Sequence, residues 1–518
     1  MNSFQQKLLS YLHIEEKDLS LYTKDVTYDD LESPNAFIEM DKATERIHKA
    51  IANKEKVMIY GDYDCDGISS TAILVKMFQY LGLKVGYYIP SRYIDGYGIN
   101  LSRAEQIKNK GYSLVITVDN GVSAFEALEY LKKENIDVIL TDHHEITREL
   151  PPYYCILHPD LKTNELHLKE CGAYVAFMLS ISVLGRVDDY LLTLAGQATI
   201  SDMMPLIEFN RNLVKLTLMI LNKHPEYPQH LLLENPQTID EEVLGFTICP
   251  KINAFGRIKE DLSINDMVRF FVINDVYTQK KIANEIEDVN NKRKILLSQA
   301  IQKVDVNSYN DKNLIILRND EISEGVIGLV ASRLLNELNK PSIVFTKVKD
   351  QDVLKGSARS LKGFSLSDAF SKVSSLLLLY GGHEEAGGLS ISIANYEEFI
   401  KQITDLSQNI TFKNEESYLE LVDEDLTYDN YLFLKSLSPF GMGYSLPKFL
   451  LHVSHDKICI MGKENQHIRG KISNNVSFVG FSLANQIINR DDLPCLGSLN
   501  YDTFRKGNNI VFRIEKII

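Results

Sequence analysis

The sequence predicts an α/β protein that begins with a parallel sheet, and three short apolar runs carry this prediction. Residues 56–61 (KVMIYG), 114–121 (LVITVDNG) and 137–145 (DVILTDHHE) are apolar runs with β-branched side chains; the first ends in glycine, and polar residues end the other two. This is typical of buried strands. Helical spacing of apolar residues follows the first two runs, over 68–83 and 123–135. Strands that alternate with helices predict a parallel, doubly wound sheet. The same domain has a further predicted strand at 84–90 and predicted helices at 101–110, 171–186 and 191–200.

Three further regions follow the parallel sheet. Residues 206–305 show mostly helical spacing, and a second alternation of strands and helices begins at NLIILRND (313–320). From about residue 415 the predicted strands are short and closely spaced, which is typical of a small barrel. We therefore expect a parallel-sheet domain with an N-terminal extension over 1–215, a helical connector over 216–305, a second α/β domain over 306–410 and an OB-like barrel over 411–518.

Composition narrows the class of protein. The chain has 518 residues, of which 44% are hydrophobic, and a net charge of −14, which weighs against a protein that coats nucleic acid. It contains no run of 18 apolar residues, and its N-terminus lacks the basic and apolar segments of a signal peptide. We therefore expect no membrane contact and a cytoplasmic location. The six cysteines form no C-x-x-C pair, so neither a zinc site nor a disulfide framework is expected.

The run Asp62-Tyr63-Asp64-Cys65-Asp66-Gly67 directly follows the first predicted strand. Three carboxylates at alternate positions in a tight turn direct oxygen ligands towards one place, as hard divalent cations require. The run also begins like a calcium-binding EF-hand loop, but its twelfth position is Ile73 rather than glutamate. A plain solvated turn is the other alternative, and a catalytic metal site is the interpretation that we favour.

Polar residues also follow the two other strands. Asp119 ends one of them, and Asp142, His143 and His144 end the next. The carboxyl ends of parallel strands share one edge of the sheet, where ligands bind in open α/β sheets, so these side chains are expected to converge. Asp202, in the segment ATISDMMPL, is a further candidate, although an aspartate there also suits a helix cap. Aspartate and histidine together suit two Mn²⁺ or Mg²⁺ ions better than a sulfur-rich site would.

Several longer motifs accompany these residues. In chain order they are PSRYIDGYGIN (90–100), HPD (158–160), INAFGRI (252–258), SEGVIGLVASRL (323–334), GSARS (356–360), GGHEEAGG (381–388) and SPFGMGYSLPKF (438–449). Together with DYDCDG, VDNG and TDHHE, this set resembles the RecJ-type single-stranded-DNA-specific exonucleases of the DHH phosphoesterase superfamily. The resemblance runs from about residue 55 to about residue 470. It implies a DHH domain, a DHH-associated (DHHA1-type) domain and an OB-fold-like nucleic-acid-binding domain.

The resemblance implies roles for individual residues. The implied metal ligands are Asp62, Asp64, Asp66, Asp119, His143 and Asp202, with Asp119 bridging two ions. The implied catalytic residues are Asp119, Asp142, His143 and His144, of which Asp142 orients a histidine and His144 contacts the scissile phosphate or supports the second metal. The implied substrate-binding residues are Asn253, Arg257, Ser357, Arg359, Gly382 and His383. From local sequence alone, Arg359 also suits a surface ion pair, and the GGH run suits a simple tight turn.

The resemblance also implies a function. It is the 5′→3′ exonucleolytic hydrolysis of single-stranded DNA by two metal ions, with release of nucleoside 5′-monophosphates, in DNA recombination and repair. The implied partners are single-stranded DNA and, beyond it, a single-strand-binding protein and a helicase. One position departs from the family pattern, because Ser323 stands where these enzymes often have a histidine. No histidine contact with the strand is expected there.

Two other functions fit parts of the pattern. A DHH-family phosphodiesterase for short oligoribonucleotides or cyclic dinucleotides would share the metal residues, but such enzymes usually consist of the first two domains alone. A non-catalytic scaffold that binds single-stranded DNA through a DHH fold is expected to have lost metal ligands. Here all of the following are present: Asp64, Asp66, Asp119, His143 and Asp202.

Basic and aromatic residues suggest where a nucleic-acid strand would bind. The helical connector contains a cluster of cations that could follow a phosphate backbone: Lys251, Arg257, Lys259, Arg269, Lys280, Lys281, Lys292, Arg293 and Lys294. In the barrel region the candidates for base stacking or backbone contact are Phe440, Tyr444, Phe449, His467 and Arg469.

Overall fold

The computed structural model describes the chain apart from residues 92–94, 97, 147–148, 164–167, 259–262, 310, 409–416, 488–491, 503–506 and 508. Part of the PSRYIDGYGIN motif and Lys259 therefore lie outside the described residues. The chain forms two compact units. One comprises Met1–Glu32, Met203–Met219 and Glu415–Ile518, and the other comprises Ser33–Asp202 and Ile220–Asn414.

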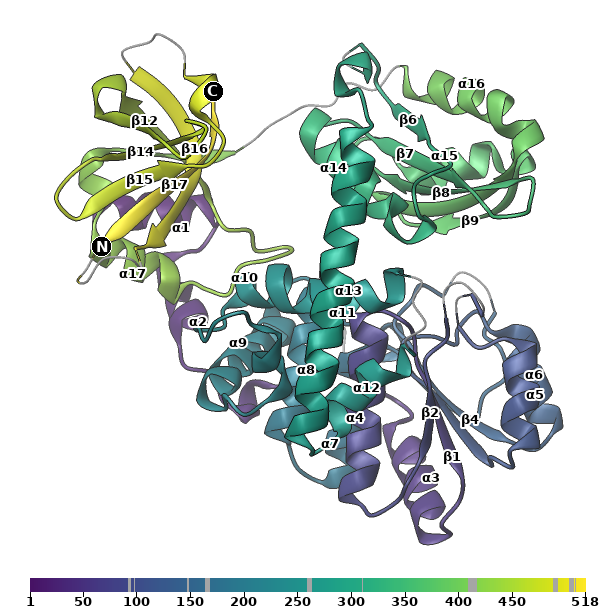
Figure 1. Ribbon diagram of the computed structural model, residues 1–518. Coiled ribbons are helices and arrows are strands. Elements are labelled where there is room, and N and C mark those ends of the chain that lie inside the picture. The colour runs from purple at the N-terminus through teal and green to yellow at the C-terminus, as the bar shows by residue number, and fades with distance from the viewer. Residues whose placement is uncertain are drawn as a thin grey trace. The chain divides into compact units, whose positions relative to one another are not determined.

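The predicted parallel sheet is present in the unit that begins at Ser33 (Figure 1). Its strand order is β2-β1-β3-β4-β5, and every pairing is parallel. The strands are β1 (Val57–Tyr60), β2 (Gly86–Tyr88), β3 (Leu114–Thr117), β4 (Asp137–Thr141) and β5 (Cys155–Leu157). The first four confirm the predicted runs, and β5 is an additional edge strand. The parallel α/β fold class predicted for this region is therefore confirmed.

Helices cover both faces of this sheet. They are α3 (Met40–Ala52), α4 (Cys65–Tyr80), α5 (Leu101–Asn109), α6 (Phe125–Lys133), α7 (Gly172–Leu184) and α8 (Asp189–Ser201). α4 packs against both α7 and α8, which explains why its residues from Cys65 to Phe78 are all buried. α5 and α6 pack together over a separate apolar core that includes Val115 and Leu140. The parallel sheet is thus covered by packed helices on both faces.

The rest of this unit contains a helical region and a second sheet. The helices are α10 (Glu241–Val243), the π-helix Leu244–Ile248, α11 (Cys249–Arg257), α12 (Asn265–Val272) and the long α13 (Val276–Gln302). The second sheet has the order β6-β7-β8-β10-β9, from β6 (Ile315–Arg318), β7 (Ser342–Lys347), β8 (Val353–Arg359), β9 (Leu377–Gly382) and β10 (Ala386–Ser392). Only β6 and β7 pair in parallel. Its helices are α14 (Ile327–Leu338), α15 (Leu366–Lys372) and α16 (Tyr396–Ser407).

The other unit contains a β-rich domain, as predicted. Among its described residues, the strands have the order β11-β12-β16-β17-β15-β14-β13. They are β11 (Tyr418–Leu421), β12 (Lys448–Ser454), β13 (Ile458–Met461), β14 (His467–Lys471), β15 (Val476–Gly480), β16 (Asp492–Tyr501) and β17 (Ile510–Ile517). Its helices include α1 (Ser3–Tyr11), α2 (Leu19–Thr23) and α17 (Tyr428–Ser436). Phe4 and Leu8 of α1 join the same apolar core as Phe449 and Phe512. Helix α9 (Glu208–Lys223) spans the division between the units.

The aromatic residues at 440, 444 and 449 of the SPFGMGYSLPKF motif are not available to stack on bases. Phe440, Tyr444 and Phe449 are all buried, so the expectation that they contact a nucleic-acid strand is wrong. The guanidinium of Arg211 donates hydrogen bonds to the carbonyls of residues 437–439 and lies 4.4 Å from the centre of the Tyr444 ring. The motif therefore stabilises the core of this unit. In the part of the chain that the structure describes, no helix has the length and apolar character of a membrane span.

Candidate metal centre

The DYDCDG run forms the turn from β1 into α4. Asp64 caps the helix, because its Oδ1 accepts hydrogen bonds from the backbone N–H groups of Asp66 (2.9 Å) and Gly67 (3.1 Å). A Cβ atom at Gly67 would lie 2.5 Å from the backbone nitrogen of Asp62. Glycine at this position thus allows the turn to fold tightly over its own aspartates.

Asp66 is buried and is oriented by a second helix. Its two carboxylate oxygens accept hydrogen bonds from the backbone N–H groups of Gly172 and Ala173, each at 2.7 Å. These groups belong to the first turn of α7, where N–H groups lack partners within the helix and where the helix dipole favours a negative charge. The start of α7 therefore holds Asp66 in one position.

Asp119 follows β3 and has a left-handed backbone, with φ of 60°. Aspartate tolerates this conformation better than most side chains do. A Cβ atom at Gly172 would lie 2.7 Å from the Cβ of Asp119, so the first turn of α7 can approach Asp119 only because it carries a glycine. Asp119 is 2% exposed.

Asp142 organises the two histidines that follow β4. Its Oδ1 accepts hydrogen bonds from the backbone N–H groups of His143 (2.8 Å) and His144 (3.1 Å) and contacts Nδ1 of His144 at 2.8 Å. Its Oδ2 accepts the N–H of Val122. The resemblance implied that Asp142 orients a histidine, and the ring that Asp142 contacts here is that of His144.

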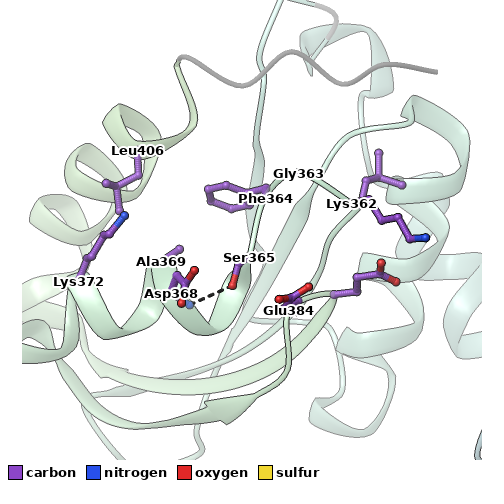
Figure 2. Close-up of a pocket in the computed structure, with 11 residues that line it drawn as sticks. Lys362, Gly363, Phe364, Ser365, Asp368, Ala369, Lys372, Glu384 and Leu406 are labelled. Atoms are coloured by element: carbon purple, nitrogen blue, oxygen red, sulfur yellow. Dashed lines mark hydrogen bonds between the residues drawn. The ribbon is translucent and has the colours of Figure 1, made fainter. Parts of the chain in front are cut away.

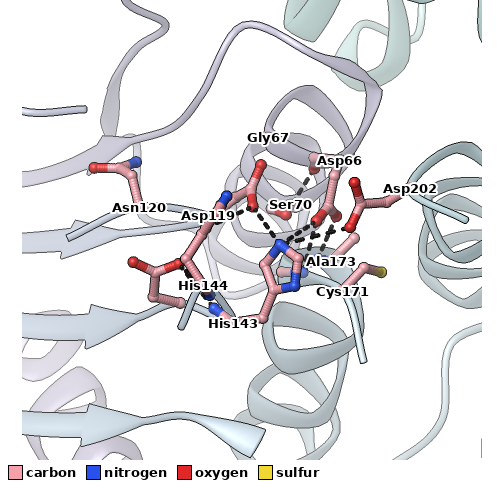
Figure 3. Close-up of polar contacts among 12 residues, drawn as sticks. Asp66, Gly67, Ser70, Asp119, Asn120, His143, His144, Cys171, Ala173 and Asp202 are labelled. Carbon is pink, nitrogen blue, oxygen red and sulfur yellow. Dashed lines mark hydrogen bonds and ion pairs between the residues drawn. The ribbon is translucent and has the colours of Figure 1, made fainter. Parts of the chain in front are cut away.

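The aspartates and His143 meet at one point. Nε2 of His143 lies 3.1 Å from Asp119 Oδ1, 3.5 Å from Asp66 Oδ2 and 3.6 Å from Asp202 Oδ2 (Figure 3). Asp202 is the residue at the C-terminal end of α8. The convergence expected at the carboxyl edge of the sheet is thus present, with Asp202 included.

The cluster contains more negative charge than the protein compensates. Burial raises the pKa of Asp119 well above its usual range, and repulsion from Asp66 and the neighbouring aspartates raises it further. Burial and Asp66 raise the pKa of Asp202 to about 8, and burial and Asp64 raise that of Asp66 to about 6. Burial lowers the pKa of His143 to about 3, so the ring is neutral and its Nε2 can donate a lone pair.

The donor atoms suit divalent cations. Three groups of donors lie within 4.8 Å of one another: Asp62, Asp64 and Asp119; Asp66, His143 and Asp202; and Asp119, His143 and His144. Oxygen and imidazole donors are those that Mn²⁺ and Mg²⁺ accept, and cations would relieve the repulsion between the carboxylates. Asp119 and His143 each belong to two of the groups. A carboxylate has two oxygens and can contribute to two neighbouring ions, whereas the single lone pair on Nε2 of His143 can bind one.

A cavity of about 220 Å³ opens beside the cluster. Its lining comprises Asp62, Tyr63, Asp64, His144, Asn253, Gly256 and Arg257. Two of the predicted substrate-binding residues, Asn253 and Arg257 of α11, therefore lie next to the aspartates. A Cβ at Gly256 would lie 2.4 Å from the carbonyl oxygen of Tyr63, so glycine allows α11 to come this close.

Asn253 also has a structural contact that the sequence did not suggest. Its Oδ1 accepts the backbone N–H of Cys65 at 2.8 Å, and its Nδ2 donates to Ser201 Oγ at 3.1 Å. The side chain thus joins the start of α4 to the residue before Asp202. Lys251, expected in a phosphate track, is buried with its Nζ donating to the Leu232 carbonyl. That expectation is wrong, because α11 packs this face against α13.

The other predicted substrate-binding residues lie on the second sheet. Ser357 and Arg359 are on β8, and Gly382 ends β9 directly before His383. Gly382 has φ of 132°, and a Cβ there would lie 2.3 Å from the Ala386 carbonyl, so the GGH run is a turn that requires glycine. The strands β8 and β9 both pair with β10, which brings the four residues to one end of the sheet.

A cavity of about 430 Å³ lies next to these segments (Figure 2). Its lining includes Lys362 and Ser365, which follow Arg359, and Glu384, which follows His383. Charges of both signs line it, and the hydroxyl of Ser365 caps α15 by accepting the N–H of Asp368. The sequence did not indicate this cavity.

Family models match three parts of the chain. The match to the DHH family, N-terminal domain, covers residues 56–198, the DHHA1 domain covers 311–409, and the RecJ OB domain covers 419–516. The three matches occur in the order expected from the sequence motifs.

Individual proteins of known name are also similar. A single-stranded-DNA-specific exonuclease RecJ from Haemophilus influenzae is 31% identical over 464 residues, which cover 82% of this chain and 80% of that protein. The RecJ exonuclease of Bacillus subtilis is 33% identical over 486 residues, which are 90% of this chain but 61% of that protein. The Mn²⁺ complex of RecJ from Thermus thermophilus aligns with a TM-score of 0.84 and 25% identity over 99% of this chain and 77% of that one. That protein has also been solved with Mg²⁺.

Proposed function

The chain belongs to the RecJ family of the DHH phosphoesterases, and we propose that it is a metal-dependent exonuclease that degrades single-stranded DNA from an end. The observation that carries the proposal is the convergence of Asp66, Asp119 and Asp202 on Nε2 of His143. The RecJ OB domain match over 419–516 favours a polymer over a short oligoribonucleotide or cyclic dinucleotide as the substrate. Retention of the whole donor set favours catalysis over a scaffold role.

We assign the metal ligands from the donor groups. Asp62, Asp64 and Asp119 would hold one Mn²⁺ or Mg²⁺ ion, and Asp66, His143 and Asp202 would hold the other. Asp119 also belongs to the group with both histidines, which makes it our choice for the bridging ligand. When bound, two such ions polarise a phosphodiester, activate water and neutralise the charge that develops on the phosphate.

The chain's own residues would prepare the substrate. His144 lines the cavity beside the cluster. Burial tends to lower its pKa, but the hydrogen bond and the charge of Asp142 raise it to about 9, so the ring would present a positive charge to a phosphate oxygen. Arg257, which lines the same cavity, would hold a second phosphate through its planar guanidinium. Through its bonds to the Cys65 N–H and to Ser201 Oγ, Asn253 would keep α11 beside Asp64 and Asp202. It would also face the bound DNA.

Further details of the proposal come from the family. Arg359 and His383 would bind phosphates farther along the strand, with Ser357 and Gly382 shaping that surface. The polarity would be 5′→3′, the products nucleoside 5′-monophosphates, and the context DNA recombination and repair in the cytoplasm. A single-strand-binding protein and a helicase would be partners. The domain boundaries 1–215, 216–305, 306–410 and 411–518 stay a proposal.

An end-labelled degradation assay tests this function. The purified chain with Mn²⁺ is given a 5′-phosphorylated single-stranded DNA, the same sequence as a blunt duplex, and an RNA of two to five nucleotides. We expect mononucleotides from the single strand and little product from the duplex. Activity on the short RNA with none on the long single strand would refute the exonuclease proposal and support an oligoribonucleotide phosphodiesterase.

A further inference from the structure

A buried ion pair in the first domain has no part in the chemistry proposed above. Nζ of Lys162 contacts the carboxylate of Glu170. The two side chains are 1% and 0% exposed. The Lys162 ammonium also lies 4.7 Å from the centre of the Phe37 ring and 5.4 Å from that of Tyr174, where the faces of two aromatic rings favour a cation.

Stability alone does not account for such a pair. Removing two charges completely from water costs several kcal/mol per ion, and replacing a buried pair with apolar side chains is often neutral or stabilising. A pair at this depth is better explained by what it holds in place. Glu170 lies two residues before α7, the helix whose first turn contacts the metal donors.

The segment Glu170–Ala173 contacts three of the proposed ligands. The His143 ring lies against the backbone of Glu170, which favours a proton on the ring. Nε2 of that ring faces the carboxylates, so Nδ1 is the nitrogen left for Glu170, and a proton held there leaves Nε2 free to bind a cation. The N–H groups of Gly172 and Ala173 bind Asp66, and Gly172 lies against Asp119.

The other end of the ion pair is anchored to a different part of the domain. Lys162 forms an antiparallel bridge with Phe37, and the N–H of Thr163 donates to the Ala36 carbonyl at 2.8 Å. The pair therefore connects the segment beside Phe37 to the first turn of α7. A shift of that turn would move the Glu170 backbone beside His143 and both donors for Asp66 together.

We propose that Lys162 and Glu170 are positioning residues that fix the start of α7 and so set the geometry of Asp66 and His143 for metal binding. The inference rests on the proposed metal centre but not on the identity of the polymer. Removing groups that orient metal ligands typically weakens metal affinity about 10- to 100-fold. We expect an effect of this size on Mn²⁺ binding.

The test measures Mn²⁺ binding to the apoprotein without DNA, by titration calorimetry or by the electron paramagnetic resonance signal of free Mn²⁺. The variants are Lys162→Met, Glu170→Gln and the double variant K162M/E170M. A thermal melt in EDTA reports the stability of each. We expect the Mn²⁺ dissociation constant to rise about 10- to 100-fold in all three variants. The variant Lys162→Arg keeps the positive charge, and we expect it to retain most of the wild-type affinity for Mn²⁺.

Glu55→Gln is the matched control. Glu55 forms a largely buried ion pair with Arg46 at the opposite end of the parallel strands. We expect this variant to lower the melting temperature while its Mn²⁺ dissociation constant stays within about twofold of the wild-type value, since none of its contacts reaches the cluster.

The double variant keeps the proposal testable if the single variants fail to fold, because it leaves no unpaired charge. Wild-type Mn²⁺ affinity in a folded K162M/E170M would overturn the positioning role. An equal loss of affinity in Glu55→Gln would also overturn it, because the effect would then be one of general stability. If the wild-type chain itself binds no Mn²⁺, the proposed metal centre fails instead.

Discussion

The two ends of the parallel strands carry buried charge in opposite ways. At the amino end, Arg46 is 5% exposed and donates to Asp137 at 2.7 Å and to Glu55 at 2.8 Å. At the carboxyl end, carboxylates face one another around a neutral histidine. The pKa values follow this difference. Burial tends to raise the pKa of Glu55, but the hydrogen bond from Arg46 and others leave it lowered, whereas burial and repulsion raise that of Asp202 to about 8.

This difference separates stability from function. The protein neutralises the charges at the amino end with its own side chains, so that end needs nothing from solution. At the carboxyl end the neutralising charge has to come from bound cations, which is the state that an enzyme requiring two metal ions must reach. Substitutions at the two ends should therefore have opposite effects on stability and on activity.

The largest effect is expected from Asp119→Asn. Asparagine also tolerates the left-handed backbone, so the change removes mainly the charge. Loss of the proposed bridging ligand should lower kcat on single-stranded DNA by about 10³-fold or more, since the metals contribute several kcal/mol to transition-state stabilisation. Removing one of several repelling charges should leave the melting temperature in EDTA unchanged or raised. Near-wild-type turnover would remove Asp119 from the bridging role.

Arg46→Met should have the reverse effect. It leaves Glu55 and Asp137 without their cation in a largely buried position. Breaking a buried pair costs about 3–5 kcal/mol, and because the side chain of Asp137 is 41% exposed, we expect a value near the lower end, about 3 kcal/mol. Denaturant unfolding measures this cost. A parallel assay at a temperature where the variant is folded should give wild-type kcat, and a large loss of kcat there would mean that the two ends are coupled.

The stabilisation that added Mn²⁺ gives should differ between variants at the two ends of the parallel strands. A ligand that binds only the folded state stabilises it by about 2.7 kcal/mol at one hundred times its dissociation constant. We expect this gain for the wild type and equally for Arg46→Met, measured as the rise in denaturation midpoint on adding Mn²⁺. Asp119→Asn should lose most of the gain. Equal gains in all three proteins would place the Mn²⁺ elsewhere.

The sequence predicted the carboxyl end well for a physical reason. Asp119 and His143 directly follow β3 and β4, and Asp66 lies in the turn and helix start that follow β1. Parallel strands necessarily bring their carboxyl ends together. Asp66, Asp119 and His143 could therefore be placed at one edge from local patterns alone. Asp202 follows a helix, so the strand pattern did not place it. From local sequence it was a candidate that also suited a helix cap, the family resemblance implied that it is a ligand, and the structure places its Oδ2 3.6 Å from His143 Nε2.

What the sequence did not predict depends on packing between distant segments. The N–H of Gly172 binds Asp66 across 106 residues, and Asn253 binds the N–H of Cys65 across 188. The periodicity of apolar residues in the sequence does not reveal such long-range contacts. The barrel aromatics show the same limit, since Phe449 is buried against a core that includes Phe4 of the N-terminal helix. Meanwhile Phe481, which was not predicted to matter, is 52% exposed beside His467 and Arg513.

The smallest effect concerns Asp142, which lies at the carboxyl end but resembles the amino end in having its charge compensated. The chain supplies its partners, namely His144 and the N–H of Val122. Asp142→Asn should therefore lower both activity and stability. It weakens the hydrogen bond that orients His144, so kcat should fall about tenfold, and it leaves the N–H of Val122 facing an amide, so the melting temperature should fall slightly. Mn²⁺ affinity should fall less than in Asp119→Asn, because Asp142 belongs to none of the donor groups.

Thr141→Val is the matched control, since it removes a buried hydrogen bond to the Thr117 carbonyl at the adjacent position without touching a histidine. If Thr141→Val lowers kcat as much as Asp142→Asn does, then Asp142 stabilises the strand end and does not orient His144.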